Sequence, residues 1–152
     1  MGKKLLVTLV LLAGACSGAA LAQENFTVGA VWSCAAYRTN PGLADDYLKY
    51  LRENLVPTTA ESKAQGLILD RKIFTQMPAS SDDWDVLICS LYPSYGKALD
   101  YDADVDAKMK AIQAKHYKTP DEKQQEAMTA KRLEMRKFLW SRVFREINLR
   151  PM

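Results

Sequence analysis

The pattern of hydrophobic and polar positions changes repeatedly between strand-like and helix-like periods. Stretches rich in β-branched, small and aromatic residues predict four strands, over residues 26–38, 67–75, 84–92 and 138–147. Apolar positions three and four residues apart predict helices between the first two strands and, twice, between the last two. The element order is therefore β-α-β-β-α-α-β.

The helix after the first strand has recognisable start and stop signals. Asp45 and Asp46 lie in its first turn, where carboxylates favour the positive end of the helix dipole. Pro57 is expected to kink or interrupt this helix. A second stretch over residues 59–65 should end at Gly66 as a C-terminal cap. The expected buried stripe consists of Tyr47, Leu48, Leu51 and Leu55.

Two more helices are predicted over residues 95–115 and 120–137, the second with Pro120 at its first position after Thr119 as N-cap. Four aspartates between positions 100 and 106 resemble the start of a calcium loop. An EF-hand loop needs Gly at its sixth position and Glu at its twelfth, where this chain has Val105 and Ala111. The acidic run therefore predicts helix capping and no dedicated metal site, with a weak adventitious calcium site as the alternative.

This element order is the ferredoxin-like β-α-β-β-α-β sandwich, an α+β fold, with an extra helix before the last strand. Both faces of several strands are largely apolar, for example Val31 and Ala35 on one side of the first strand and Trp32 and Cys34 on the other. Because a broad apolar face is unstable in water, a second sheet should cover it. A second copy of the chain is the economical source, so we expect a homodimer.

Two segments resemble the dimeric α+β barrel superfamily. The first is Asn-Pro-Gly at residues 40–42, followed by the amphipathic helix with Tyr47. The second is Asp-Trp-Asp-Val-Leu at residues 83–87, running on to Tyr-Pro at residues 92–93. Members of this superfamily include antibiotic-biosynthesis-type monooxygenases, stress-responsive barrel proteins, and EthD-like and NIPSNAP-like proteins. The resemblance covers most of residues 26–147 and is one of pattern and fold. It implies a homodimer whose sheets face each other around a cavity, which in the catalytic members holds the substrate.

The first 22 residues have the pattern of an export signal. Two lysines precede an apolar run over residues 5–15, and small residues around Ala22 suit a signal peptidase. The run is shorter than the ~20 apolar residues that a membrane helix needs, so no stable membrane span is expected. We expect cleavage after Ala22, one exported domain over residues 23–152, and a periplasmic or secreted location. Lipidation at Cys16 is the alternative, disfavoured by Ala13, where such signals usually carry a bulky aliphatic residue.

The charge balance excludes one class of partner. The processed chain has 19 basic and 18 acidic residues, a net charge of +1, which does not suit nucleic-acid binding. Residues 23–107 hold 7 basic and 13 acidic side chains, whereas residues 108–152 hold 12 and 5. We interpret the basic segment as a solvated helix that pairs with the acidic body. A basic surface for an anionic ligand or a membrane is the other interpretation.

Two cysteines, Cys34 and Cys89, remain after processing. Outside the cytoplasm two thiols often pair, which favours one disulfide. Both residues lie in apolar strand-like runs, where free cysteines are also common core residues. Both interpretations stay open, and the spacing matches no metal motif.

A few residues have side chains suited to a ligand. Arg71 and Arg142 each lie within a predicted strand among apolar neighbours. Each must therefore be exposed, face a cavity, or pair with a neighbouring acid: Asp70, Asp85 or Glu146. His116 is the only histidine and ends a helix, where it favours the negative end of the dipole. The candidate ligand-binding set is Trp32, Tyr37, Arg71, His116, Trp140 and Arg142.

These expectations favour a binding or accessory protein that holds a small apolar or weakly anionic molecule between the two sheets of a homodimer. A planar ligand would lie against Trp32 or Trp140 while Arg142 donates to it. The alternative is a cofactor-independent or haem-linked monooxygenase of the same superfamily. No catalytic residue is identified, because the polar set is thin. No cofactor is expected, with haem left open through His116.

Overall fold

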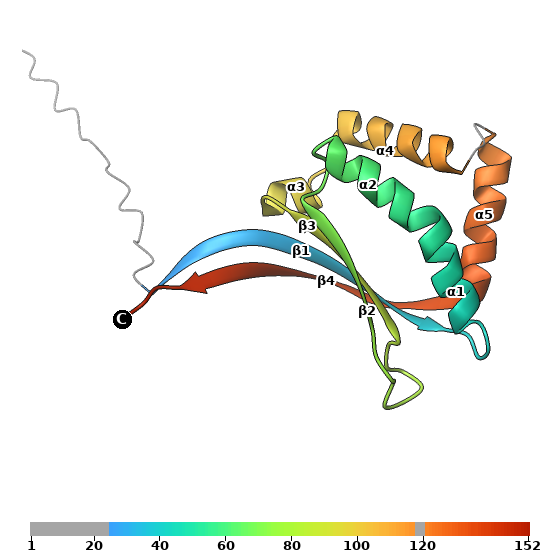
Figure 1. Cartoon of the computed structure of the whole chain (residues 1–152), viewed down its shortest axis with the longest axis horizontal. Coiled ribbons are helices and arrows are strands. Elements are labelled where there is room, and N and C mark those ends of the chain that lie inside the picture. The colour runs from blue at the N-terminus through green and yellow to red at the C-terminus, as the bar shows by residue number, and fades with distance from the viewer. Residues whose placement is uncertain (1–24, 118–120) are drawn as a thin grey trace, which may run out of the picture.

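The computed structural model of the chain describes residues 25–117 and 121–152. The predicted export signal, Cys16 and the expected cap at Thr119 and Pro120 therefore lie outside the described residues. The elements, in chain order, are β1 (Phe26–Thr39), α1 (Ala44–Tyr50), the π-helical segment η1 (Leu51–Leu55), α2 (Val56–Ala64), β2 (Asp70–Thr75), β3 (Val86–Tyr92), α3 (Tyr95–Leu99), α4 (Ala103–His116), α5 (Glu122–Met135) and β4 (Arg136–Leu149) (Figure 1).

A four-stranded antiparallel sheet with helices on one side makes this an α+β protein (Figure 1). The strand order is β2-β3-β1-β4, and every neighbouring pair is antiparallel. This arrangement is compatible with the expected ferredoxin-like fold and places the first and last strands side by side. β2 begins three residues later than predicted, at Asp70, and the other strands agree with their predicted bounds within two residues.

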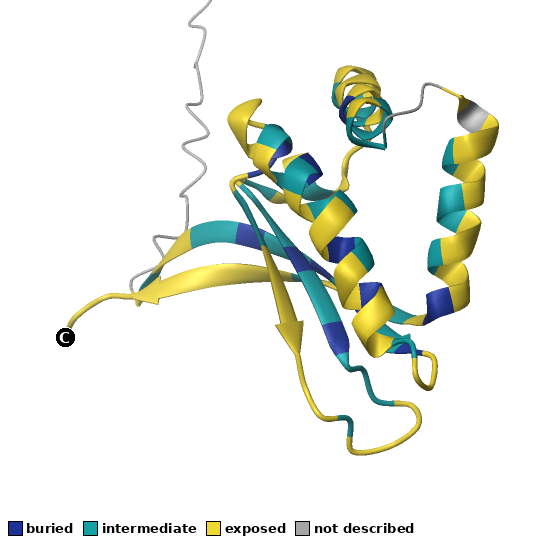
Figure 2. Cartoon of the chain, turned by 45° about the vertical axis from the view of Figure 1, so that its right-hand side comes forward, coloured by how far each residue is buried: buried dark blue, intermediate teal, exposed yellow. Residues whose placement is uncertain are grey.

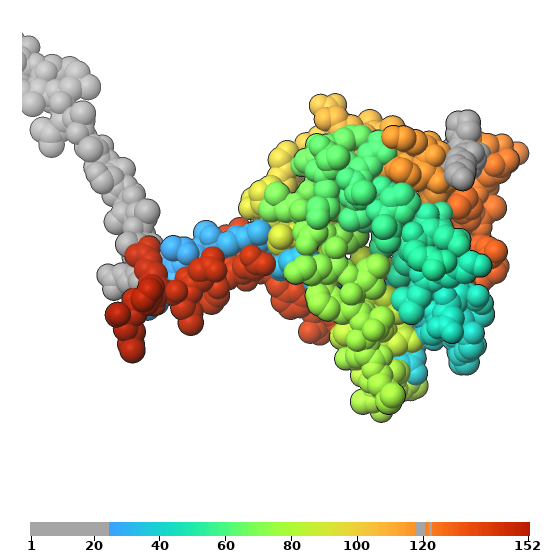
Figure 3. All heavy atoms as spheres, viewed as in Figure 1, coloured from blue at the N-terminus to red at the C-terminus, as the bar shows by residue number. Residues whose placement is uncertain are grey.

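β1 and β4 are much longer than the other two strands. β1 pairs with β4 along its length, from Phe26 to Thr39, whereas β3 pairs with β1 only from Val31 onward. The far ends of β1 and β4 therefore project from the body as a two-stranded ribbon (Figures 1 and 3). Gly29 lies at an irregularity in this ribbon, where a Cβ would come within 2.9 Å of the Glu146 Cβ.

The register divides the side chains between two faces, since paired residues point to the same side and successive residues to opposite sides. The inner face, which the helices cover, carries Ser33, Ala35, Tyr37, Arg71, Ile88 and Ser90. The outer face carries Trp32, Cys34, Ala36, Lys72, Phe74, Leu87, Cys89, Trp140, Arg142 and Phe144. Among the described elements, the helices lie on the inner side only (Figures 1 and 2).

The helices and the inner face share a small core. Tyr47, Leu51, Val86 and Met135 form its centre. The predicted helix stripe is confirmed at Tyr47 and Leu51 but is wrong at Leu48, which is 37% exposed. Leu48 directly follows Tyr47, so it turns about 100° around the helix and away from the sheet.

Pro57 changes the helix without ending it. The backbone passes from α1 into η1 and then into α2, where Pro57 lies in the first turn. A π-helical turn and a first-turn position both tolerate the missing N–H of proline, so the helical path continues. The helix ends as predicted at Gly66, which has a φ of +68° and donates its N–H to the carbonyl of Lys63.

The prediction of one helix over residues 95–115 is wrong, because the chain forms α3 and α4 with a break between them. Asp102 is the N-cap that begins α4, since its side chain accepts hydrogen bonds from the N–H groups of Asp104 and Val105. The bond from Val105 is the main influence that lowers the pKa of Asp102. The acidic run therefore caps a helix, as expected. The N-cap of α5 is Asp121.

Candidate functional site

A cavity of about 280 Å³ lies between the inner face of the sheet and the helices. Small or polar side chains form its floor, among them Ser33, Ala35 and Ser90. Large apolar side chains normally fill the space between a sheet and its covering helices, so small residues leave a void. This volume suits a small organic molecule.

Positive charge lines this cavity without a matching acid. Its lining includes Arg71, Arg132 and Arg136, and none of the described lining residues is Asp or Glu. None of the three arginines forms an ion pair within residues 25–117 and 121–152. A neighbouring groove of about 890 Å³ mixes three acidic residues with two lysines. Of these two, only the smaller cavity has cations and no acid among its described lining residues.

Arg136 is packed against two tyrosines. It is opposite Thr39 in the sheet and is only 9% exposed. Its guanidinium carbon lies 3.3 Å from the centroid of the Tyr37 ring and 5.2 Å from that of Tyr47, which stabilises the cation through the ring faces. Its Nε and Nη1 atoms are buried and have no hydrogen-bond partner in the described part of the chain. These donors are therefore open to an anion.

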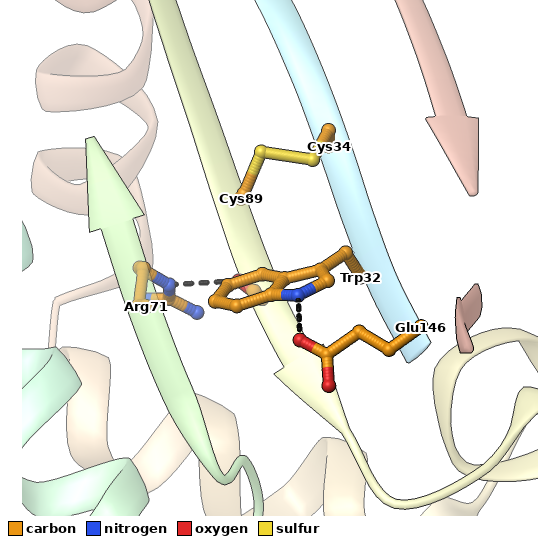
Figure 4. Close-up of a disulfide and its surroundings, with 6 residues drawn as sticks. Trp32, Cys34, Arg71, Cys89 and Glu146 are labelled. Atoms are coloured by element: carbon orange, nitrogen blue, oxygen red, sulfur yellow. Dashed lines mark hydrogen bonds between the residues drawn. A yellow bond between two sulfur atoms is a disulfide. The ribbon is translucent and has the colours of Figure 1, made fainter. Parts of the chain in front are cut away.

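Two hydroxyl groups hold the guanidinium of Arg71 in place. Its Nε donates to Ser90 Oγ at 2.9 Å, the bond marked by the dashed line from Arg71 in Figure 4. Its Nη1 donates to Thr59 Oγ1 at 3.1 Å. Burial lowers the pKa of Arg71, although a guanidinium stays protonated at any physiological pH. The two bonds fix the direction of the guanidinium at the edge of the cavity formed by β2 and β3.

The tyrosines of the cavity are neutral donors. Tyr47 is fully buried, and its hydroxyl has no hydrogen-bond partner among the described residues. Burial raises the pKa of Tyr47, although the adjacent Arg136, which lies outside hydrogen-bond geometry, partly opposes the shift. Burial and the neighbouring Tyr117 raise the pKa of Tyr50 to about 12. Both phenols therefore remain protonated near neutral pH.

The lining of the cavity offers hydrogen-bond donors beside apolar side chains. The described lining residues include no His, Cys, Asp or Glu, which are the side chains that most often act as bases or nucleophiles. They do include guanidinium and phenol donors beside the apolar side chains of Leu51, Leu55 and Ile88. This arrangement can hold and orient an anion.

The outer face contains the disulfide. Cys34 and Cys89 occupy paired positions on β1 and β3, and their sulfur atoms are bonded (Figure 4). Both residues are 4% exposed. Of the two interpretations left open by the sequence, the structure has the disulfide.

The aromatic and charged residues around the disulfide contact one another. Trp32 donates its Nε1 hydrogen to Glu146 Oε1 at 2.6 Å (Figure 4). Lys72 Nζ lies 5.4 Å from the centroid of the Trp32 ring. The guanidinium carbon of Arg142 lies 4.9 Å from the centroid of the Trp140 ring.

The candidate ligand-binding set is thus divided between the two sides of the sheet. Arg71 and Tyr37 line the inner cavity. Trp32, Trp140 and Arg142 share the outer face, as the register of β1 with β4 requires. A single small ligand bound to one chain cannot contact all five.

The ion pairs considered for Arg71 and Arg142 do not form. Asp70 pairs with Lys63 at 2.7 Å, Asp85 accepts a hydrogen bond from the backbone N–H of Thr39, and Glu146 accepts from Trp32. Each acid is therefore engaged elsewhere.

His116 lies outside the lining of the inner cavity, at the end of α4. Its Nε2 is 2.6 Å from Glu61 Oε2 on α2, and Lys115 Nζ is 2.9 Å from the same oxygen. The hydrogen bond from Lys115, followed by that from His116, lowers the pKa of Glu61. The half-buried His116 thus joins two helices.

Arg132 and Arg136 were not among the residues expected to bind a ligand. Arg132 and Arg136 were interpreted as part of a solvated basic segment. Met128 and Arg132 are four residues apart, which places Arg132 on the same side of α5 as an apolar residue. This spacing could have identified Arg132, whereas Arg136 begins β4, where helical spacing does not apply.

Of the helices described in residues 25–117 and 121–152, none has the length and apolar character needed to cross a membrane. Over the same residues, no three side chains of His, Cys, Asp or Glu are grouped so that they could hold a metal ion. In comparisons with protein-family models, curated proteins and solved structures, nothing matches this chain.

Proposed function

We propose that this protein binds a small anionic molecule in the cavity between the inner face and the helices. One observation carries the proposal: the Nε and Nη1 donors of the buried Arg136 have no partner in the described chain. An anion at this position would neutralise the charge and accept from these donors. Charge-assisted hydrogen bonds of this kind are about twice as strong as neutral ones.

This proposal moves the ligand to the opposite side of the sheet from the sequence-based hypothesis. On the outer face of the single chain, Arg142 and Lys72 are exposed to water, and each lies over a tryptophan ring. An exposed cation has little to gain from a ligand, because water already solvates it. A desolvated cation has much more to gain.

The monooxygenase alternative gains no specific support. His116, the residue through which haem was left open, contacts Glu61 and is not part of the cavity lining. The raised pKa values of Tyr47 and Tyr50 keep both phenols protonated near neutral pH, and a protonated phenol cannot accept a proton as a base.

Export is part of the proposal. A disulfide between Cys34 and Cys89 is compatible with an oxidising compartment. The N-terminal sequence of the protein recovered outside the cytoplasm should begin at Gln23. A lipidated N-terminus at Cys16 would contradict cleavage after Ala22.

A homodimer formed through the outer face is also part of the proposal. Phe74 and Phe144 on this face are 45% and 47% exposed, and burying them against a second copy would be favourable. The face carries both signs of charge, Lys72 and Arg142 together with Glu146, which suits a symmetric interface. Solution scattering should give the mass of a dimer, and Phe144→Glu should give a monomer. A monomeric wild type would rule out this assembly.

Ligand-dependent thermal unfolding tests the binding proposal. The processed protein should unfold at a higher temperature with a carboxylate such as hexanoate, because a ligand that binds only the native state adds ~2.7 kcal/mol of stability at one hundred times its Kd. Arg136→Met should lose this shift, whereas Arg142→Met on the outer face should keep it. The proposal fails if monocarboxylates, dicarboxylates, phosphate and sulfate all leave the wild-type transition unchanged.

A further inference from the structure

The cationic groups of the cavity lie at two separate ends. The Arg71 guanidinium is hydrogen-bonded to the side chain of Ser90 on β3, and Ser90 lies opposite Ser33 of β1 in the sheet. The Arg136 guanidinium lies over the ring of Tyr37. Ser33 and Tyr37 are four residues apart on the same face of one strand, so the two ends are ~13 Å apart along β1.

Arg132 belongs to the same end as Arg136. Both guanidinium groups act on the Tyr47 hydroxyl and lower its pKa against the effect of burial. The Nε of Arg132, like that of Arg136, is buried without a partner in the described chain. One end of the cavity therefore offers two guanidinium groups with open donors.

The Arg71 end offers one guanidinium with fewer open donors. Its Nε and Nη1 are used by Ser90 and Thr59, and its Nη2 makes no hydrogen bond within the described residues. The Ser33 side chain lines the cavity at this end. A second anionic group could bind here, more weakly than at the paired arginines.

Apolar side chains separate the two ends. Ala35 and Ile88 are a directly paired couple midway between Ser33 and Tyr37. Leu51 and Leu55 complete this middle section from the helix side. The sheet side of the cavity is therefore cationic at its ends and apolar at its centre. On the helix side, Asn54 and Thr58 also line the cavity, but both already donate to backbone carbonyls of their own helix.

We propose that the ligand is a linear molecule with an acidic group at each end and a short apolar middle. This inference rests on the proposed binding function and names its ligand class. A guanidinium–carboxylate pair places its two carbons ~4 Å apart. Two such pairs leave ~5 Å between the carboxyl carbons, a span close to that of glutarate or adipate. Arg132 and Arg136 hold one carboxylate, and Arg71 holds the other.

Calorimetric titration of the processed protein with three acids tests the ligand class. Adipate should bind ~10- to 100-fold more tightly than hexanoate, which has the same chain length and one carboxylate, because only adipate forms the second charge-assisted contact. Succinate is too short to reach both ends and should lose most of this advantage.

Variants at Arg71 test the assignment of the second end. Arg71→Met should lower the affinity for adipate to that for hexanoate, and it should leave the affinity for hexanoate unchanged. Arg71→Gln keeps a polar side chain and provides the same test if the methionine variant does not fold. Lys72→Met is the matched control, because the adjacent side chain points to the outer face. It should leave both affinities unchanged.

The outcomes separate this inference from the function on which it rests. Equal affinities for hexanoate and adipate in the wild type would overturn the two-ended ligand and leave anion binding intact. An adipate preference that persists in both Arg71 variants would overturn the role of Arg71. Absence of binding by every anion would contradict the proposed function itself.

Discussion

The two faces of the same sheet carry similar residue types but differ in how far water reaches them. On the outer face, Arg142 lies over Trp140 and is exposed to solvent. On the inner face, Arg136 lies over Tyr37 but is 9% exposed, with two nitrogen atoms unpaired in the described chain. The aromatic contact is the same, and the access to water differs. Burial therefore distinguishes a solvated cation from one that gains by binding an anion.

Because of this difference, we expect the outer face to contribute mainly to stability and the inner face to ligand binding. The outer face has a covalent link between β1 and β3 and hydrogen-bonded polar groups. The inner face retains a cavity and unpaired donors, both of which lower stability in the absence of a ligand. We expect substitutions on the outer face to change stability without changing affinity, and substitutions on the inner face to change affinity.

The largest expected effect is at the disulfide. The double substitution Cys34→Ala and Cys89→Ala should lower the free energy of unfolding by about 4 kcal/mol, because the bond closes a loop with a sequence separation of 55 in the unfolded chain. Denaturant unfolding of the two proteins measures this difference. At a temperature where the variant is folded, its affinity for the anion should match that of the wild type. A large loss of affinity would show that the two faces are not independent.

A smaller effect of the opposite sign is expected at Arg136. In the absence of ligand, Arg136→Met should raise the free energy of unfolding by about 1 kcal/mol, since removing a buried unpaired cation outweighs the lost ring contacts. The control variant Lys108→Met, at an exposed cation on α4 away from the proposed dimer interface, should change it by less than about 0.5 kcal/mol. Denaturant unfolding without added anions measures both. A strongly destabilised Arg136→Met protein would mean that this guanidinium is structural.

The sheet could be predicted from the sequence because its strands have strong local patterns. Turn residues at 40–42 and the apolar run before Tyr92 mark strand ends directly. One helix was expected over residues 95–115 although the acidic run was interpreted as a helix cap, because Asp102 by itself is compatible both with a helix interior and with a cap. Only its hydrogen bonds to Asp104 and Val105 distinguish the two.

The site was harder to predict because periodicity does not say which face of a strand the helices cover. Alternation correctly separates Arg71 from Lys72, yet both faces of β1 contain apolar residues. The decisive property is the burial of Arg132 and Arg136. It depends on how α5 packs beside α1, and the exposed side chains around these arginines hide it in the sequence.

The smallest expected effect concerns the helices that cover the inner face. Glu61 on α2 contacts Lys115 and His116 on α4, and these contacts lower its pKa from the usual 4.5. A carboxyl group whose pKa is lowered by folding stabilises the native state above its unfolded pKa, and this contribution is lost as the pH falls through the folded pKa. Glu61→Gln should therefore be slightly less stable than the wild type at pH 7, and the difference should shrink as the pH falls below 4.5.

Glu126→Gln, on the exposed side of α5, is the control and should show no such trend. Denaturant unfolding of the three proteins between neutral and acidic pH measures the effect, and a difference independent of pH would show that the Glu61 contacts do not stabilise the helix layer through its charge.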